Sequence, residues 1–296
     1  MPAPASAAKP KIAVVARDEE GLSLQDFLAG RLRVTKRAAK AMIDARTVWV
    51  NRKLVWMARH PLRPGDKVAF VVQRGTGARQ DKTVEARPHL RVLWQDDHYL
   101  AVDKPAGVLT QGEPSAETLL RAQEHCPGLR AVHRLDRETS GVLLMAKSDA
   151  ALDAAIAMFK TRRVTKTYAA IAAGNVERLH STLTETLDGE RAVTHLRRLQ
   201  AVPDATFLSL RIETGRTHQI RRHLAGIRHP VLGDRQYGVK HADDPRVLSV
   251  TRQMLHAAEL ELPHPMILGE HIKVHAPLPA DFRAALALFG LRKRGK

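Results

Sequence analysis

The sequence predicts an α+β fold in two parts, a small basic module at residues 19–74 and a larger domain at residues 90–290. Its 296 residues are enough for one large domain or two ordinary ones. The first 90 residues hold 18 basic and 8 acidic side chains, whereas the rest of the chain holds 30 and 23. This difference in charge density marks a boundary. From Leu90 onward, strand and helix signals alternate along the chain.

The composition predicts a folded protein with a polyanionic partner. Hydrophobic residues make up 44% of the chain, which is enough for a packed core, although aromatic residues contribute only 4%. Lys and Arg number 48 against 31 Asp and Glu, which gives a net charge of +17. An excess of this size favours nucleic acid as the partner first and an anionic membrane surface second.

The single cysteine and the ends of the chain indicate a cytoplasmic protein without a membrane anchor. Cys126 cannot form a disulfide within one chain, which fits a reducing compartment. No apolar run approaches the roughly 18 residues that a membrane span requires. The Ala- and Pro-rich start lacks the apolar stretch of a secretory signal. We expect a flexible tail at residues 1–18, a polar linker at residues 75–89 and a basic tail at residues 291–296.

In the basic module, apolar residues recur at helical spacing from Leu24 to Leu32 and predict a first helix. Thr35 is a suitable N-cap for a second helix. The second helix carries three basic residues near one face, Lys36, Arg37 and Lys40. Strands and one turn are expected after the helices, at residues 48–50, 53–55, 64–66 (the turn) and 67–72.

Two short helices followed by strands, with basic residues where the second helix starts, resemble the RNA-binding module of ribosomal protein S-four. The resemblance covers residues 20–72, and Arg52 stands where that module often has Gly. It implies RNA contacts by Lys36, Arg37 and Lys40. A generic basic α+β domain is the alternative.

The larger domain is expected to alternate buried strands with amphipathic helices. The expected strands are residues 91–94, 99–102, 142–145, 168–172, 193–202 and 207–212. The expected helices are residues 150–159 and a helix that opens within residues 218–224.

The segment from His133 to Leu144 is the most informative part of this domain because it sets one carboxylate among cations. Asp136 lies between Arg134 and Arg137, just before a buried strand. Residues 139–141 (Thr-Ser-Gly) form a small turn whose bare backbone permits close approach by a substrate. The alternative is that Asp136 caps a helix or forms a structural ion pair.

Three further segments carry chemistry. Lys104 follows an apolar strand in an Asp-Lys-Pro-Ala-Gly turn, which on its own is more often structural. Tyr168 opens a strand beside lysines and fits either the core or a stacking face for a base. A strand then ends at Gly215, and the following helix start is dense in Arg and His. Such a helix start offers backbone N–H groups and positive charge to phosphate.

Several classes of site do not fit. His218 and His223 are five residues apart, unlike the paired histidines of a zinc helix. Asp136 and Glu138 are too close in sequence for the separated acids of a glycosidase. Nucleotide-binding glycine motifs are absent from the sequence. We therefore expect neither a metal nor a cofactor.

Together these segments resemble the pseudouridine synthases of the RluA family over residues 91–280. The run from His133 to Gly141 matches the catalytic signature of that family without departure. By this resemblance Asp136 takes the place of the catalytic Asp, Tyr168 of the active-site tyrosine and Arg221 of the arginine that pairs with the catalytic Asp. Residues 229–234 and 237–238 continue the pattern, as do residues 255–257 and 264–265. Arg228 departs from the common Gly.

The resemblance implies a mixed, largely antiparallel sheet with a central cleft, and an enzyme that isomerises uridine in RNA without a cofactor. If Arg221 forms a bidentate bond with Asp136, it would hold the orientation of the carboxylate and favour its charged form. Four residues are candidates for phosphate contacts: Arg134, Lys104, Arg216 and Arg222.

Large-subunit ribosomal RNA is the expected substrate, because the basic module is typical of the ribosomal RNA members of that family, and a monomer is expected. The alternatives are transfer RNA as substrate, a non-catalytic RNA-binding or ribosome-assembly protein, and an RNA hydrolase that uses His218 and Asp136.

Overall fold

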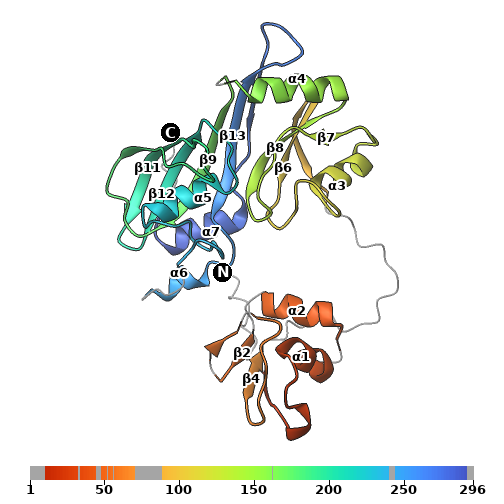
Figure 1. Cartoon of the computed structure of the whole chain (residues 1–296), viewed down its shortest axis with the longest axis vertical. Coiled ribbons are helices and arrows are strands. Elements are labelled where there is room, and N and C mark those ends of the chain that lie inside the picture. The colour runs from red at the N-terminus through yellow and green to blue at the C-terminus, as the bar shows by residue number, and fades with distance from the viewer. Residues whose placement is uncertain are drawn as a thin grey trace, which may run out of the picture. The chain divides into compact units, whose positions relative to one another are not determined.

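The computed structural model describes residues 11–291 except residues 33, 45–47, 52, 56, 71–88, 162 and 240–243. The chain divides into two compact units, Met1–Thr83 and Val84–Lys296 (Figure 1). Each unit has a hydrophobic core of its own. The expected linker falls outside the described residues except for its last position, and the basic tail does so except for its first. None of the helices in the described ranges has the length and apolar character needed to cross a bilayer.

The N-terminal unit packs two helices against a small antiparallel sheet with the strand order β1-β4-β2-β3. Its elements are β1 (Lys11–Val14), a short 3-10 turn (Arg17–Glu19), α1 (Leu24–Leu32), α2 (Lys36–Asp44), β2 (Val48–Val50), β3 (Lys53–Leu54) and β4 (Lys67–Phe70). Leu24, Phe27 and Leu28 are buried, as the helical spacing predicts. The Ala38 N–H donates to the Thr35 hydroxyl at 3.2 Å, so the predicted cap is confirmed.

The flexible tail expected at residues 1–18 is wrong for the part that the structure describes. Strand β1 pairs antiparallel with β4, from Lys11 opposite Phe70 to Val14 opposite Lys67. Val15 follows with 2% of its surface exposed. A free sheet edge offers unpaired N–H and C=O groups, and a short β-branched stretch can satisfy them. The expected continuation of β4 to residue 72 lies outside the described residues.

The C-terminal unit is built on a ten-stranded sheet whose central order is β10-β11-β12-β9-β13-β8-β6-β5. Its strands are β5 (Arg91–Gln95), β6 (Tyr99–Lys104), β7 (Arg130–Ala131), β8 (Ser140–Ala146), β9 (Thr165–Ala173), β10 (His180–Leu183), β11 (Thr194–Val202), β12 (Ala205–Ile212), β13 (Leu255–Pro263) and β14 (His271–His275). Its helices are α3 (Ala116–Gln123), α4 (Asp149–Phe159), α5 (Gln219–Gly226), α6 (Pro245–Ser249) and α7 (Ala280–Leu288).

The named strands of this sheet pair antiparallel except β8 and β13, which run parallel. The prediction of a mixed, largely antiparallel sheet is therefore confirmed. The expected strands and helices all form, with ends that differ by a few residues. The elements of this unit that the sequence did not predict are α3, β7, β10, α6, α7 and the β13–β14 hairpin.

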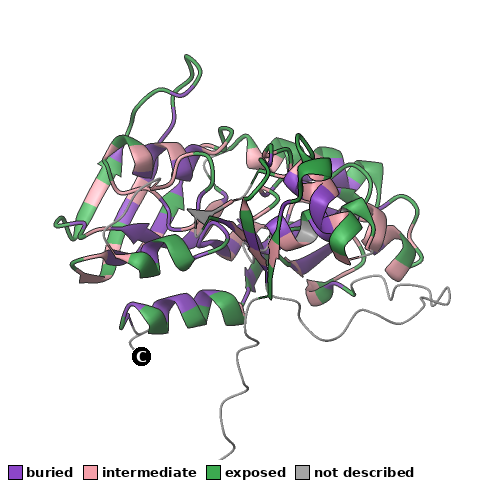
Figure 2. Cartoon of the chain, turned by 90° about the horizontal axis from the view of Figure 1, so that it is seen from below, coloured by how far each residue is buried: buried purple, intermediate pink, exposed green. Residues whose placement is uncertain are grey.

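Helices cover both faces of the sheet. Helices α3 and α5 pack on the face that carries Leu143 and Tyr168. On the other face, α4 covers Val142 and Leu144, and α7 covers Phe207. Every residue of β8 is buried, because helices cover the strand on both faces. Such a strand needs apolar side chains on both faces. Helix α7 covers the sheet with one side only, and Figure 2 shows that this helix has one buried and one exposed side.

The glycine of the Thr-Ser-Gly segment serves strand packing and not the close approach of a substrate. Gly141 lies in β8 with φ of 114°, a conformation that favours glycine. A Cβ atom at this position would come within 2.2 Å of the Ala257 carbonyl oxygen on β13. The bare backbone therefore allows the parallel β8 and β13 to meet directly after the Asp136 loop.

Candidate active site

Asp136 lies in the loop between β7 and β8, and buried neighbours fix this loop. The Thr110 hydroxyl bonds both the N–H and the carbonyl of Leu135, at 3.0 and 2.9 Å. The Thr139 N–H donates to the Asp136 carbonyl at 3.0 Å, which closes the turn. Leu135 is buried, whereas the Asp136 side chain is 22% exposed. The loop thus holds the carboxylate at the surface of a packed element, where a substrate can reach it.

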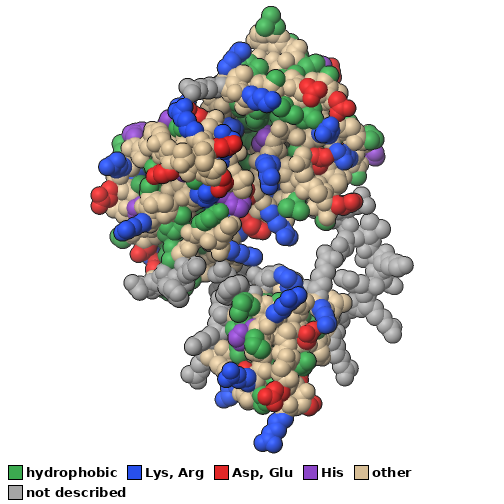
Figure 3. Space-filling model, in the orientation of Figure 1, with side chains coloured by type: hydrophobic (Ala, Val, Ile, Leu, Met, Phe, Trp, Pro, Cys, Tyr) green, Lys and Arg blue, Asp and Glu red, His purple; other side chains and the backbone are tan. Residues whose placement is uncertain are grey.

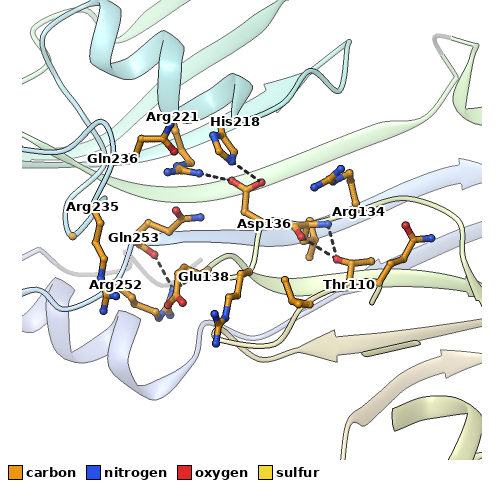
Figure 4. Close-up of a pocket in the computed structure, with 15 residues that line it drawn as sticks. Thr110, Arg134, Asp136, Glu138, His218, Arg221, Arg235, Gln236, Arg252 and Gln253 are labelled. Carbon is orange, nitrogen blue, oxygen red and sulfur yellow. Dashed lines mark hydrogen bonds and ion pairs between the residues drawn. The ribbon is translucent and has the colours of Figure 1, made fainter. Parts of the chain in front are cut away.

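Helix α5 supplies the groups that face Asp136. Gln219 is buried and bonds Val193 and Thr194 through its side-chain amide, which anchors the helix start to β11. His218 precedes the helix in the left-handed conformation, with φ of 55°. Figure 4 shows His218 and Arg221 pointing at the Asp136 carboxylate from this helix. Residues far apart in the sequence therefore converge on one acid.

Arg221 contacts two carboxylates at once. Its Nη1 donates to Asp136 Oδ2 at 3.0 Å. Its Nε and Nη2 donate to Asp234 Oδ2 and Oδ1 at 2.6 and 2.9 Å. The bidentate bond considered for Asp136 therefore goes to Asp234, and Asp136 receives a single bond. The second oxygen of Asp136 lies 3.8 Å from His218 Nε2.

The surroundings fix the protonation states of these groups. Burial alone would lower the pKa of Arg221, but its bonds to Asp234 and Asp136 outweigh burial and raise that pKa. Burial would raise the pKa of Asp234, yet the Arg221 guanidinium and two backbone N–H groups lower it. Burial lowers the pKa of His218 despite the nearby Asp136. The site therefore holds a permanent cation between two carboxylates, beside a neutral imidazole at neutral pH.

Asp136 borders two cavities. The larger has a volume of about 530 Å³ and is lined on one side by polar residues such as Gln236 and Gln253. The smaller, of about 90 Å³, has Tyr168 and the apolar side chains Ile212 and Leu255 on its walls. A polar cavity beside a small one with an aromatic wall offers space for a nucleotide and its base.

Tyr168 lies in β9 with 9% of its surface exposed and lines the smaller cavity together with Asp136. Burial, assisted by the Asp136 charge, raises the pKa of Tyr168 above its ordinary value. Its hydroxyl is therefore neutral at physiological pH. Asp136, Tyr168 and Arg221 thus lie around one cavity, although β9 and α5 follow the Asp136 loop at different points in the chain.

The arginines expected at phosphate lie in different surroundings. Arg134 is exposed and lines both cavities. Arg216 lines the smaller cavity and forms an ion pair with Glu190. Arg222 donates two bonds to Asp188, at 2.8 and 3.1 Å, and lines neither of the two cavities. Of the three, only Arg134 borders both of the spaces next to Asp136.

Lys104 cannot contact phosphate in this structure, which corrects the expectation from its sequence. Its side chain is fully buried. Its Nζ donates to the carbonyls of Pro105, Val108 and Arg137, at 3.0, 2.8 and 3.2 Å. Burial lowers the pKa of Lys104 to about 8. The ammonium group ties the turn after β6 to the Asp136 loop, so its role is structural.

The three basic residues of the N-terminal unit that are expected to contact RNA lie in α2. Lys36 is exposed and forms an ion pair with Asp26 at 2.7 Å. Lys40 is exposed, and the side chain of Arg37 lies outside the described residues. Figure 3 shows Lys and Arg side chains on the visible face of this unit. Their contacts with RNA stay a prediction.

The sequence did not predict Asp234 as a site residue, although Asp234 is the last residue of the run 229–234 that continues the family pattern. The signal was an acid three residues before the Tyr237-Gly238 pair. His223, which the analysis weighed as a metal ligand, is buried and bonds Thr194 and the carbonyl of Glu185. Across the part of the chain that the structure describes, His, Cys, Asp and Glu form no group of three that could hold a metal ion.

Known proteins are similar to this chain in sequence and in fold. A family model described as RNA pseudouridylate synthase matches residues 98–226. The chain is 34% identical over 275 residues to the ribosomal large subunit pseudouridine synthase D of Pasteurella multocida, a match that covers 82% of this chain and 83% of the relative. The chain belongs to the RNA pseudouridylate synthase family. The resemblance of the larger domain to pseudouridine synthases is thereby confirmed, and this pseudouridine synthase is an isomerase that acts on RNA.

Two further matches support the family of this pseudouridine synthase. The enzyme of the same name from Xanthomonas campestris is 33% identical over 294 residues, with 88% of this chain and 85% of the relative covered. The solved structure titled "Human RNA Pseudouridylate Synthase Domain Containing 1" is 30% identical and has a TM-score of 0.55. That match covers 65% of this chain and 84% of the human chain.

Proposed function

We propose that this enzyme converts uridines of large-subunit ribosomal RNA to pseudouridine, with Asp136 as the catalytic aspartate. One observation carries the proposal: the Asp136 carboxylate lies at a cavity that Tyr168 also lines, and it is bonded to Arg221 at 3.0 Å. Relatives named as ribosomal large subunit enzymes support this substrate. The basic N-terminal unit, with its proposed likeness to the S-four module, supports binding to structured RNA.

The proposed reaction breaks the bond from the ribose to N1 of uracil and forms a bond from the ribose to C5. The hydrogen on C5 leaves as a proton, and N1 ends the reaction protonated, so no electrons are gained or lost. The reaction is thus balanced without a cofactor. The target uridine must leave its stack to reach Asp136, which costs a few kcal/mol and costs least in loops.

Asp136 has three possible parts in this reaction: attack on the sugar, attack on the uracil ring, or removal of a ribose proton. Each part needs the charged carboxylate that Arg221 stabilises. Tyr168 packs on the flipped base. Its hydroxyl helps to remove the proton from C5, the carbon that forms the new bond to the ribose. Arg134 and Arg216 contact the phosphates around the flipped nucleotide, and Arg222 contacts RNA further from Asp136.

Pseudouridine mapping in a strain that lacks this chain tests the proposal. Ribosomal and transfer RNA are mapped in the deletion strain and after return of the wild type or Asp136→Asn. We expect sites in large-subunit ribosomal RNA to disappear and to return with the wild type only. Loss confined to transfer RNA would replace the substrate, and unchanged maps would favour a non-catalytic RNA-binding protein. Strand cleavage by purified enzyme would favour the hydrolase.

We propose that the enzyme acts as a monomer in the cytoplasm, where the expected RNA is found. The single, partly buried Cys126 suits a reducing compartment. Light scattering of the purified chain at several concentrations tests the oligomeric state, since a concentration-dependent mass would contradict a monomer.

A further inference from the structure

Asp234 occupies an unusual position for a buried acid. It accepts two of the three hydrogen bonds that Arg221 donates to carboxylates, and Asp136 accepts the third. Its side chain is fully buried, and it accepts two bonds from Arg221. Asp234 Oδ1 also accepts from the N–H groups of Gln236 and Tyr237, at 2.9 and 3.0 Å. Four donors therefore fix this carboxylate.

The loop around Asp234 is rigid on both sides. A Cβ atom at Gly233 would come within 1.9 Å of the Arg252 carbonyl oxygen, and one at Gly238 within 2.0 Å of the Asp234 carbonyl oxygen. Only glycine fits at these two positions. The loop is held tightly against its neighbours, so the Asp234 carboxylate has little freedom to move with Arg221.

The same loop reaches Asp136 by a second route. The Tyr237 ring covers the Arg221 guanidinium at 5.0 Å. The Tyr237 hydroxyl bonds His218 Nδ1 at 3.2 Å, and His218 Nε2 lies 3.8 Å from Asp136 Oδ1. Each oxygen of Asp136 thus faces a group that the Asp234 loop holds in place.

We propose that Asp234 is a positioning residue that both orients Arg221 and shares its charge, so that Asp136 is held in place without being fully neutralised. One guanidinium between two carboxylates leaves a net negative charge. A carboxylate that keeps part of its charge unpaired is the stronger nucleophile and base. This inference rests on the proposed role of Asp136.

Other charged and titratable groups face this pair and must be considered in a pH experiment. They are Arg134, Arg137 and Glu138 on the Asp136 loop, Lys104 at the end of β6, Tyr168 from β9, Arg216 and His218 before α5, Arg235 and Tyr237 on the Asp234 loop, and Arg252 before β13. His218 can titrate between acid and neutral pH, because burial lowers its pKa from 6.5, so the design below includes its replacement.

The test is single-turnover kinetics of Asp234→Asn on an RNA that the wild type modifies, measured from acid to neutral pH. Without the Asp234 charge, the Arg221 cation acts on Asp136 alone. The acid limb of the rate profile should then move to lower pH by about one unit. The maximal rate should fall roughly 10- to 100-fold, because the catalytic groups are held less well. The Kd for RNA should not change, since the Asp234 side chain is fully buried.

Several variants separate charge sharing from a merely structural role. Asp234→Glu keeps the charge, so its acid limb should stay in place although its rate falls. Asp234→Ser is a second neutral variant that can keep the turn bond if Asp234→Asn fails to fold. The shift should persist when His218→Gln is added. Asp188→Asn is the matched control, because Asp188 forms a similar fork with Arg222 but is exposed.

A rate loss in the neutral variants without a shift of the acid limb would overturn the charge-sharing proposal. A shift that disappears in the His218→Gln background would overturn it as well. Neutral variants with the wild-type rate and profile would overturn both the positioning and the charge-sharing role. An inactive wild type would instead contradict the proposed function, so the two failures are distinct.

Discussion

Arg221 donates one hydrogen bond to Asp136 over 3.0 Å, although 85 positions separate the two residues in the chain. The contact brings the start of α5 against the loop before β8. It leaves one Asp136 oxygen bonded to the guanidinium and the other near His218. The carboxylate is thus oriented by a neighbour and still open to the cavity.

Replacement of Arg221 by Lys should lower catalysis more than RNA binding. A lysine keeps the charge but cannot bond Asp234 in a fork and Asp136 at the same time. We expect the single-turnover rate to fall roughly 100-fold, as for a misplaced catalytic group, with little change in Kd. Arg246→Lys is the control, because Arg246 also pairs with two carboxylates, Asp204 and Asp244, but lines neither cavity at Asp136. A nearly unchanged rate for Arg221→Lys would contradict the orienting role.

Replacement of Tyr168 separates the ring from the hydroxyl. Tyr168→Phe keeps the stacking wall, so RNA affinity should persist, while loss of the hydroxyl should slow turnover roughly 100-fold. Tyr168→Leu also removes the aromatic face and should weaken binding of the flipped base by about 1–3 kcal/mol. Quench-flow rates and RNA binding assays check both effects. Equal activity of Tyr168→Phe and the wild type would remove the hydroxyl from the mechanism.

Replacement of Gly141 by Ala should destabilise the C-terminal unit. The new Cβ would lie 2.2 Å from the Ala257 carbonyl oxygen, at a residue with φ of 114°. Overpacking and backbone strain together should cost about 3 kcal/mol or more. Gly189→Ala is the control, because Gly189 has φ of 78° but open space around a Cβ. Equal shifts of the urea midpoint in the two variants would show that strand packing is not the cause.

Stability should fall as pH drops from about 6.5 towards 4, in part because of His256. This residue is fully buried between Ser140 and Ala276, and burial lowers its pKa from 6.5 to about 4. In that window the unfolded chain binds a proton that the folded chain does not, so acid favours unfolding. His256 should account for up to about 3 kcal/mol of the loss. Urea unfolding of His256→Gln should therefore show a shallower dependence on pH, and an equally steep one would contradict this role.

Deletion of residues 1–75 should weaken RNA binding and leave residues 91–280 folded. The N-terminal unit has its own core, and the C-terminal unit has separate clusters that cover both faces of its sheet. Affinity should fall, and its dependence on salt should become less steep, because fewer phosphates are contacted. Circular dichroism and RNA titrations check the fold and the affinity. In the full chain, Lys36→Ala with Lys40→Ala should give a smaller change of the same kind, and an unchanged Kd after the deletion would remove the module from RNA binding.

The sequence predicts much of the fold because local signals were strong. The run from Val142 to Ala146 is apolar at every position, as a strand covered on both faces needs. Thr35 is an N-cap because its hydroxyl bonds a residue three positions on. Strand β1 gave no such signal, since its four residues gain stability only from pairing with β4, more than fifty positions later.

The sequence by itself determined that Asp136, Tyr168 and Arg221 lie in motifs that resemble those of one enzyme family, because each motif is a contiguous run. Only the tertiary structure decided how those side chains are used. It gave the fork of Arg221 to Asp234, buried the Lys104 ammonium under three carbonyls, and set the Gly141 backbone against Ala257. These outcomes depend on which distant segments meet and on how much water remains between them. Neither quantity is encoded in a short run of residues.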